Sequence, residues 1–496
     1  MQLTAQAFAI DSNVTTLPRY DRDALTSGIL HISLGAFHRA HAAVYLDDYL
    51  NLHAENWLIT AVGLMPQDRA LVDAMRSQDG LYSVLERAKN QDACRMIGSI
   101  REVVHAPTET ALLIARISDP AIRIISLTIT EKGYCHDAER NLDPANPHWQ
   151  ADLSPDGNLA TIHGYLLRGL QARRENQGGP VTILSCDNLP DNGGLTKKLF
   201  LQFAGLADST MLRWIAENIS FPSSMVDRIT PVPDDAVRRV VAETYGLADK
   251  CPVVCETYRQ WIIEDDFIAG RPRLEEVGVQ FVNDVAPYEK MKVRLLNGSH
   301  SALSYIAIML GYRHVDDALS DGRLHRFLAG YMRCDIVPTL SPVPGIDLGN
   351  YQKVLLARFS NAAIRDQVQR LAEDGSQKVR NALIPPLLYQ IATGGHYHHL
   401  VFALAAWYRY LTGVDEHGAA IAIKDPLQDA LRDCARMHPI DPTPFLQMEA
   451  IFDPILRDQP VFLSRLKSDL EAIHRVGMSR ALDDFLIFSE NVDKRD

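Results

Sequence analysis

Several features that mark particular classes of protein are missing from this sequence of 496 residues. Its seven cysteines, at positions 94, 135, 186, 251, 255, 334 and 434, are too few and scattered for a disulfide scaffold, and the pair at 251 and 255 has no second pair to complete a zinc site. No run reaches the roughly 18 apolar residues of a membrane span, and the first residues lack the pattern of a signal peptide. These absences favour a cytoplasmic protein that does not bind membranes.

Positive charge is also scarce. The chain has 50 Lys and Arg against 62 Asp and Glu, a net charge of −12, which disfavours nucleic acid and anionic membrane surfaces as partners. A hydrophobic content of 47% and a charged content of 23% are typical of a globular protein, and the length predicts more than one domain. We expect a small-molecule ligand. The sequence leaves the oligomeric state open, and a monomer is compatible with it.

The distribution of apolar residues predicts an α/β half followed by a mainly helical half. Apolar runs at 29–34, 57–62, 96–100, 122–129 and 181–185 indicate strands, and they alternate with helical spacing such as 36–50 and 111–117. This alternation predicts a parallel sheet in a Rossmann-like domain over 1–285. Strand-like runs then nearly vanish, and 286–496 is predicted as a mainly helical domain. Its expected helices are 288–312, 316–333, 361–373, 398–412, 426–436 and 459–475.

Two positions suggest a dinucleotide site, although the glycine-rich fingerprint is incomplete. Gly35 follows the first expected strand, but Ser33 stands where the fingerprint has its first glycine. A turn that needs a positive φ explains Gly35 equally well. Asp68 follows the second strand, where an acid can bind the ribose hydroxyls of NAD, and a simple helix cap is the alternative. The histidines at 38 and 41 and at 396, 398 and 399 lack partners at metal-ligand spacing.

The most informative segment is 287–300, which carries Lys292, Asn297 and His300. On an α-helix these three lie within an arc of about 140°. A lysine base, an amide donor and an imidazole are groups that alcohol and carbonyl redox chemistry uses. As a base, Lys292 needs a pKa lowered from about 10.4 toward roughly 7–8 by burial or by neighbouring cations.

With these motifs, the chain resembles the polyol-specific long-chain dehydrogenases, a family that includes mannitol 2-dehydrogenases and fructuronate reductases. The resemblance covers essentially the whole chain. It rests on ISFPSSMVDRITP at 219–231, on the Lys-x4-Asn-x2-His spacing that ends at His300, and on LGAFHRAH at 34–41. It implies a metal-independent oxidoreductase that uses NAD.

The resemblance also implies a role for each matching residue. Lys292 matches the general base, Asn297 and Asn188 the donors to the reacting oxygen, and His300 a ligand of the substrate hydroxyls. The other matches are grouped by role: Asp227, Arg370 and Lys378 on the substrate side, Glu131 and Glu289 as a proton relay, and Gly35, Ala36, Phe37, Arg39 and Asp68 for the cofactor.

Departures from the family pattern leave alternatives open. Ser33 replaces a family glycine, which puts cofactor affinity in doubt, and Gln67 weakens the argument against NADP. The resemblance favours D-mannitol and D-fructose as the substrate pair. Fructuronate reduction remains an alternative, because Arg370, Lys378 or Lys132 could bind a uronate carboxylate. A non-catalytic NAD-binding sensor is the third possibility.

Overall fold

The computed structural model describes residues 16–493 except 90, 138 and 155–157. The chain divides into two compact units, Met1–Ala286 and Pro287–Asp496. Residues 1–15, to which the expectation of no signal peptide applies, lie outside the described residues. No helix in the described ranges combines the length and the apolar character needed to cross a bilayer.

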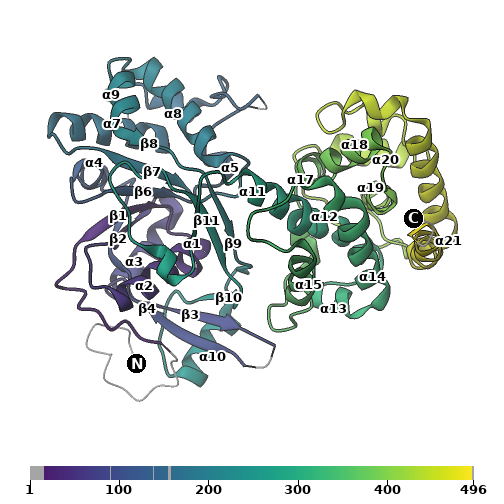
Figure 1. Ribbon diagram of the computed structural model, residues 1–496, viewed down its shortest axis with the longest axis horizontal. Coiled ribbons are helices and arrows are strands. Elements are labelled where there is room, and N and C mark those ends of the chain that lie inside the picture. Colours follow the sequence, from purple (N-terminus) through teal and green to yellow (C-terminus); the bar gives the residue numbers. More distant parts are fainter. Residues whose placement is uncertain (1–15, 90, 138, 155–157, 494–496) are drawn as a thin grey trace. The chain divides into compact units, whose positions relative to one another are not determined.

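The first unit is built on a six-stranded parallel sheet (Figure 1). Its order is β5-β2-β1-β6-β7-β8, with β1 (Ser27–Ile32), β2 (Leu58–Gly63), β5 (Ile100–His105), β6 (Ile124–Leu127), β7 (Val181–Ser185) and β8 (Ile219–Ser220). The chain adds strands on one side of β1 through β2 and on the other side through β6. This is the doubly wound Rossmann order, whose direction switches between β1 and β6.

Helices cover both faces of this sheet, which is why its strands are apolar throughout. Leu30 and Ile32 of β1 belong to a core that includes α4 and α7, whereas Ile59 and Ala61 of β2 belong to a core that includes α2. The helices of this unit are α1 (Ala36–Ala40), α2 (Ala42–Leu52), α3 (Arg69–Arg76), α4 (Thr110–Ser118), α5 (Thr130–Gly133), α6 (Pro147–Ala151), α7 (Ile162–Glu175), α8 (Asn192–Ala207), α9 (Met211–Asn218), α10 (Asp235–Tyr245) and the 3-10 turns η2 (Pro66–Asp68) and η3 (Leu274–Val277).

Two three-stranded sheets complete the first unit. One has the order β10-β3-β4, with β10 (Val253–Glu256), β3 (Tyr82–Arg87) and β4 (Ala93–Ile97). The other has the order β12-β11-β9, with β12 (Gln280–Val282), β11 (Gln260–Glu264) and β9 (Ser224–Asp227). The segment at 219–231, one of those on which the resemblance rests, therefore includes β9 and ends in the loop after it.

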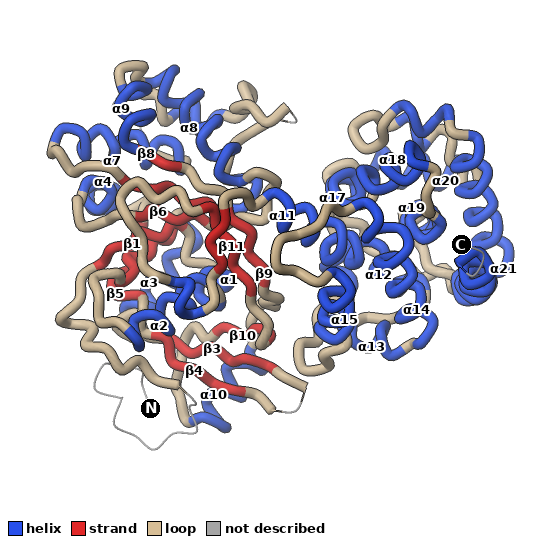
Figure 2. The backbone as a smooth tube through the Cα atoms, in the orientation of Figure 1, coloured by secondary structure: helices blue, strands red, loops and turns tan. Residues whose placement is uncertain are grey.

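The second unit is helical, with only isolated bridges in its described part (Figure 2). The segment 287–300 runs through α11 (Ala286–Lys292), the π-helix η4 (Val293–Asn297) and the start of α12 (Gly298–Met309). The other elements are α13 (Val315–Ser320), α14 (Gly322–Gly330), the π-helix η5 (Tyr331–Ile336), η6 (Val337–Thr339), α15 (Leu348–Phe359), α16 (Val368–Ala372), α17 (Gly375–Ala382), α18 (Ile384–Thr393), α19 (His398–Tyr410), α20 (Gln428–Met437), η7 (Phe445–Gln447), η8 (Pro454–Asp458) and α21 (Pro460–Asp493), which is kinked at Gly477.

The structure confirms the predicted fold class but corrects several elements, including the helix expected at 316–333, which is divided into α13, α14 and η5. The strand expected at 96–100 joins the end of β4 to the start of β5, because Gly98 and Ser99 bond instead to α2. The helix expected at 361–373 shrinks to α16, since Arg365 has a φ of 52° and Val368 donates to the Arg313 carbonyl. The helix expected at 36–50 is broken at His41.

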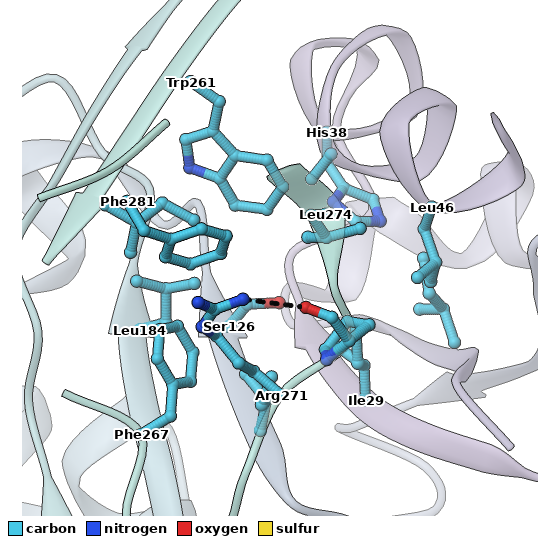
Figure 3. A pocket seen from close by; sticks show the side chains of 15 residues that line it. Ile29, His38, Leu46, Ser126, Leu184, Trp261, Phe267, Arg271, Leu274 and Phe281 are labelled. Carbon is cyan, nitrogen blue, oxygen red and sulfur yellow. Dashed lines mark hydrogen bonds between the residues drawn. The ribbon is translucent and has the colours of Figure 1, made fainter. Parts of the chain in front are cut away.

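A small cavity lies inside the first unit against the sheet (Figure 3). Ile29, Ile124 and Leu184 line it from the strands, and Trp261 and Phe281 line it from the β12-β11-β9 sheet. Its volume is about 30 Å³.

Candidate functional site

The predicted site residues of the first unit gather where the parallel strands end. Gly35 follows β1, Asp68 follows β2, Glu131 follows β6 and Asn188 follows β7. Because parallel strands end at the same edge, these four segments share one edge of the sheet, around the switch point between β1 and β6. In doubly wound folds this edge is where ligands bind.

Within this chain, neither the backbone conformation nor the packing at position 35 requires glycine. The φ of Gly35 is −71° and its ψ is 168°, an extended conformation that any residue adopts, so the alternative of a turn with positive φ is wrong here. A Cβ at this position would have no heavy atom within 4 Å among the described residues. The open space is consistent with a need for glycine that comes from a bound molecule. A dinucleotide pyrophosphate that approaches the backbone closely would need this space.

The remaining residues of the first turn have different surroundings. Ala36 and Phe37 are partly exposed, and the Phe37 ring stacks on His41 at 5.0 Å. Arg39 is buried, and its guanidinium donates to the Cys251 carbonyl at 2.5 Å. The placement of Arg39 favours a role in holding α1 over contact with a ligand.

Asp68 is held at the carboxyl end of β2. Its Oδ2 accepts a hydrogen bond from the Met65 backbone N–H at 2.9 Å, which closes the turn over 65–68. The side chain is partly exposed. A carboxylate fixed at this point is in the position that binds ribose hydroxyls in Rossmann domains.

A buried carboxylate that the sequence interpretation missed, Asp187, joins the ends of β6 and β7. It accepts hydrogen bonds from the backbone N–H groups of Ile129 and Thr130, at 3.1 and 2.8 Å, and from the Tyr134 hydroxyl at 2.8 Å. Burial raises the pKa of Asp187, and the three donors oppose that shift. Asp187 thus fixes the start of the short helix α5, which carries Glu131, next to the segment that carries Asn188.

Glu131 and Asn188 are themselves accessible. The Glu131 side chain is 47% exposed and lies 3.9 Å from His136 Nε2, and Asn188 is exposed. Asp227 differs, because it is buried at the end of β9 opposite Gln260 of β11. It lies near enough to His41 to raise the pKa of that imidazole against the larger effect of burial.

In the second unit, a π-helix separates Lys292 from Asn297. Lys292 is the last residue of α11 and is buried, and Asn297 is the last residue of η4. A π-helix bonds residues five apart, so Lys292 and Asn297 lie one above the other, closer in direction than the uniform α-helix predicted. The single α-helix expected over 288–312 is therefore wrong at this point. Widened turns of this kind often occur at functional sites.

The π-helix η4 is contacted by the second π-helix, η5. The Tyr331 hydroxyl lies 3.4 Å from the Arg294 carbonyl and occupies the space where a Cβ on Gly298 would be. The Arg294 guanidinium donates to the carbonyl and hydroxyl oxygens of Thr339, at 2.9 and 2.7 Å. Glu289 is partly buried on α11, one turn before Lys292.

His300 lies close enough to Arg370 and Lys378, the cations predicted on the substrate side, for their charges to affect its pKa. Burial, with smaller contributions from Arg370, Arg358 and Lys378, lowers the pKa of His300 to about 3, against an opposing effect of Asp366. Its Nε2 is buried and has no hydrogen-bond partner among the described residues. A buried polar atom of this kind is normally satisfied, and a substrate hydroxyl would satisfy it.

The two cations differ in their partners. Arg370 makes a two-pronged contact with Asp366, at 2.9 and 2.5 Å. Lys378 donates to the Leu371 carbonyl at 3.1 Å, and burial lowers its pKa. Arg370 therefore already has a carboxylate partner, whereas Lys378 donates to the backbone carbonyls of Arg370 and Leu371.

Two family models match nearly the whole chain. The mannitol dehydrogenase Rossmann domain matches residues 27–276, and the mannitol dehydrogenase C-terminal domain matches residues 284–474. The chain belongs to the mannitol dehydrogenase family. Its site residues at the sheet edge fall within the Rossmann match, and Lys292, Asn297 and His300 fall within the C-terminal match.

Relatives and solved structures of the mannitol dehydrogenase family agree with this assignment. The chain is 39% identical to mannitol 2-dehydrogenase of Aspergillus terreus, over 97% of this chain and 98% of the relative, and 38% identical to mannitol dehydrogenase 2 of Saccharomyces cerevisiae, over 98% and 97%. Mannitol 2-dehydrogenase of Pseudomonas fluorescens, solved as a ternary complex with NAD and D-mannitol, matches with a TM-score of 0.88 and 39% identity over 98% of this chain and 99% of that one. A substrate-free D-sorbitol dehydrogenase matches with a TM-score of 0.88 and 34% identity, over 97% and 100%.

Three buried histidines around the first turn predict acid sensitivity. Burial lowers the pKa of His31 and of His41 to about 3 and that of His38 well below its usual 6.5. The unfolded chain therefore binds more protons below pH 6.5, so stability falls as the pH drops from about 6.5 toward 3. We expect a loss of about 2 kcal/mol per histidine in the free energy of unfolding between pH 6.5 and 5.

Urea unfolding at several pH values measures this dependence. His38→Phe, which keeps a ring stacked on His31, should reduce the pH slope of the unfolding free energy, whereas His325→Gln at an exposed position should not. A His38→Phe variant with the full wild-type slope would refute the prediction.

Proposed function

We propose that the protein is a mannitol 2-dehydrogenase that interconverts D-mannitol and D-fructose with a lysine as general base and without a metal. As a family member it is an NAD-dependent polyol oxidoreductase. The relatives named mannitol 2-dehydrogenase and the solved complex with NAD and D-mannitol support the choice of substrate. The observation that carries the proposal is the π-helix, which stacks buried Lys292 and Asn297 one turn apart.

The edge of the Rossmann sheet has the features that NAD requires. The open space over Gly35 admits a pyrophosphate, and Asp68 is fixed where it can accept hydrogen bonds from ribose hydroxyls. When bound, NAD would supply the acceptor for the hydride that leaves the substrate carbon. We assign Gly35, Ala36, Phe37 and Asp68 to this group, and Arg39 to the support of α1.

The chain's own residues supply the proton chemistry. In mannitol oxidation, Lys292 removes the proton of the reacting hydroxyl, and Asn297 and Asn188 donate to the oxygen as it gains negative charge. His300 is neutral at ordinary pH and offers its unpaired Nε2 to a second hydroxyl. The proposal gives the proton transfer to Lys292, which is buried where the π-helix begins.

The remaining predicted residues take supporting roles in the proposal. Glu131 and Glu289 pass the proton to solvent, which their exposed and partly buried positions allow. Asp227, Arg370 and Lys378 bind hydroxyls of the substrate.

The pairing of Arg370 with Asp366 favours a neutral polyol over a uronate. A substrate carboxylate near Arg370 would meet the negative charge of Asp366, which already accepts hydrogen bonds from Nε and Nη2 of the guanidinium and neutralises its charge. A neutral hydroxyl has no such conflict. This observation ranks fructuronate reduction below fructose reduction.

Freeing Arg370 should shift the substrate preference. In Asp366→Asn, Arg370 loses its carboxylate partner, so we expect the ratio of kcat/KM for D-fructose to that for D-fructuronate to fall about tenfold, the effect of roughly 1.4 kcal/mol of charge pairing. Asp317→Asn, which removes an exposed partner of Arg365, is the matched control. An unchanged ratio in Asp366→Asn would show that Arg370 does not select against the carboxylate.

The proposed function is tested by NADH oxidation with D-fructose and, separately, D-fructuronate, before and after treatment with a chelator. We expect the higher kcat/KM with D-fructose, no loss on chelation, and a lower rate when NADPH replaces NADH. A higher kcat/KM with D-fructuronate would make the protein a fructuronate reductase. NADH binding without turnover of any polyol or sugar acid would favour the non-catalytic sensor.

A further inference from the structure

Ser33 has a backbone conformation that serine disfavours. Its φ is +81°, in the left-handed region that glycine enters freely, and it stands directly between β1 and the Gly35 turn. Without a restraint, a serine here would relax to negative φ and move the turn. The structure therefore has to compensate for the absence of glycine at this position.

Three donors converge on the Ser33 carbonyl. Two come from side chains, His31 Nε2 at 2.9 Å and Thr128 Oγ1 at 3.1 Å, and the third is the Gly35 backbone N–H at 2.9 Å. The Ser33 N–H is also held, by the Val62 carbonyl at 2.9 Å. The peptide groups on both sides of the positive φ are thus fixed from β2 and from the end of β6.

His31 is oriented for this contact by its surroundings. It lies opposite Ser126 in the β1–β6 register, and its Nδ1 is 2.8 Å from the Ser126 hydroxyl. A carbonyl oxygen only accepts, so Nε2 carries the proton and Nδ1 accepts from Ser126. The His31 ring also stacks on His38 at 3.3 Å, and Figure 3 shows His38 and Ser126 together at the small cavity. Burial lowers the pKa of His31 to about 3, so this arrangement holds across the working pH range.

We propose that His31 is a positioning residue for the cofactor: with Thr128 it holds the Ser33 carbonyl, and so keeps the turn from Ser33 to Gly35 in the shape that binds NADH. The inference rests on the proposed function, because it assumes that NADH binds at this turn. His31 acts through Ser33, so its effect depends on which residue stands at 33.

The test is a double-mutant cycle on the Kd for NADH, measured by fluorescence titration of the full-length protein. His31→Phe keeps the ring stacked on His38 and removes the donor. We expect it to raise the Kd about 5- to 30-fold. A change of this size matches the free energy by which a non-glycine residue prefers negative over positive φ. In a Ser33→Gly background the same change should raise the Kd less than about threefold, because glycine reaches positive φ without restraint.

A second variant and a kinetic readout distinguish the proposed positioning role from a general loss of structure. Thr128→Val removes the other side-chain donor without changing the shape, and we expect a smaller rise in Kd that Ser33→Gly also suppresses. In His31→Phe the KM for NADH should rise while kcat at saturating NADH stays within about twofold of wild type. His31→Gln, which retains an N–H donor, should recover part of the affinity.

Two results would overturn the inference. One is a Kd that does not change in His31→Phe, and the other is a Kd that rises equally in the Ser33 and Ser33→Gly backgrounds, as for a purely structural role. Failure of the proposed function looks different, since the wild-type protein itself would then fail to bind NADH or fail to turn over polyols.

Discussion

Replacement of Lys292 by alanine is expected to lower kcat for D-mannitol oxidation by about 10³-fold while leaving the Kd for NADH within twofold of wild type. General-base catalysis by a positioned side chain contributes roughly 10²–10⁴-fold. Lys292 is buried and stands at the start of the π-helix, so no other residue of that helix can take its place over Asn297. The kcat/KM profile should lose the ionisation of the general base.

Lys290 provides the matched control for this experiment. It lies on the same helix, two residues earlier, and is exposed. Lys290→Ala should keep kcat within about twofold of wild type, as a surface substitution does. Partial recovery of Lys292→Ala by added methylamine would confirm that the missing group is a base. A Lys292→Ala enzyme with near-wild-type kcat would remove lysine from the mechanism.

Replacement of Asn297 by alanine should lower kcat and kcat/KM together by about 10²–10³-fold. The amide is proposed to donate to the oxygen as its negative charge develops, and loss of one such donor has an effect of this size. Because the interaction is strongest in the transition state, KM for D-mannitol should change little. Asn297→Asp should be slower still, since a carboxylate repels the developing alkoxide.

Asn350→Ala is the control, because Asn350 is an exposed amide of the same unit, near the start of α15. Steady-state kinetics at saturating NAD give both constants. A variant of Asn297 that raised KM and left kcat unchanged would show that the amide binds the ground state only.

The sequence allowed the sheet to be predicted more closely than the loops. The run at 181–185 coincides with β7, because an interior parallel strand is apolar on both faces and ends abruptly at polar residues. The run at 96–100 crosses a strand boundary, since the break at Gly98 and Ser99 is set by bonds to α2 that no local pattern reveals. Arg365 likewise interrupts an amphipathic pattern through a tertiary contact.

The chemistry of the site was predictable where a motif has fixed spacing. Lys292, Asn297 and His300 follow from such a spacing, but the π-helix between the first two does not, because it depends on packing against Tyr331 and Thr339. Asp187 was missed although it precedes Asn188 directly. An acidic residue after an apolar strand is ordinarily exposed, and only the fold shows that the N–H groups of β6's end converge on it.

The central claim, that the chain transfers hydride between NADH and C2 of a ketose, is tested most directly by following the label from deuterated NADH. D-Fructose is reduced with NADH carrying deuterium at the transferred position, and the product is analysed by NMR. The account predicts D-mannitol with one deuterium at C2. D-Sorbitol as the product, or product without deuterium at C2, would contradict it.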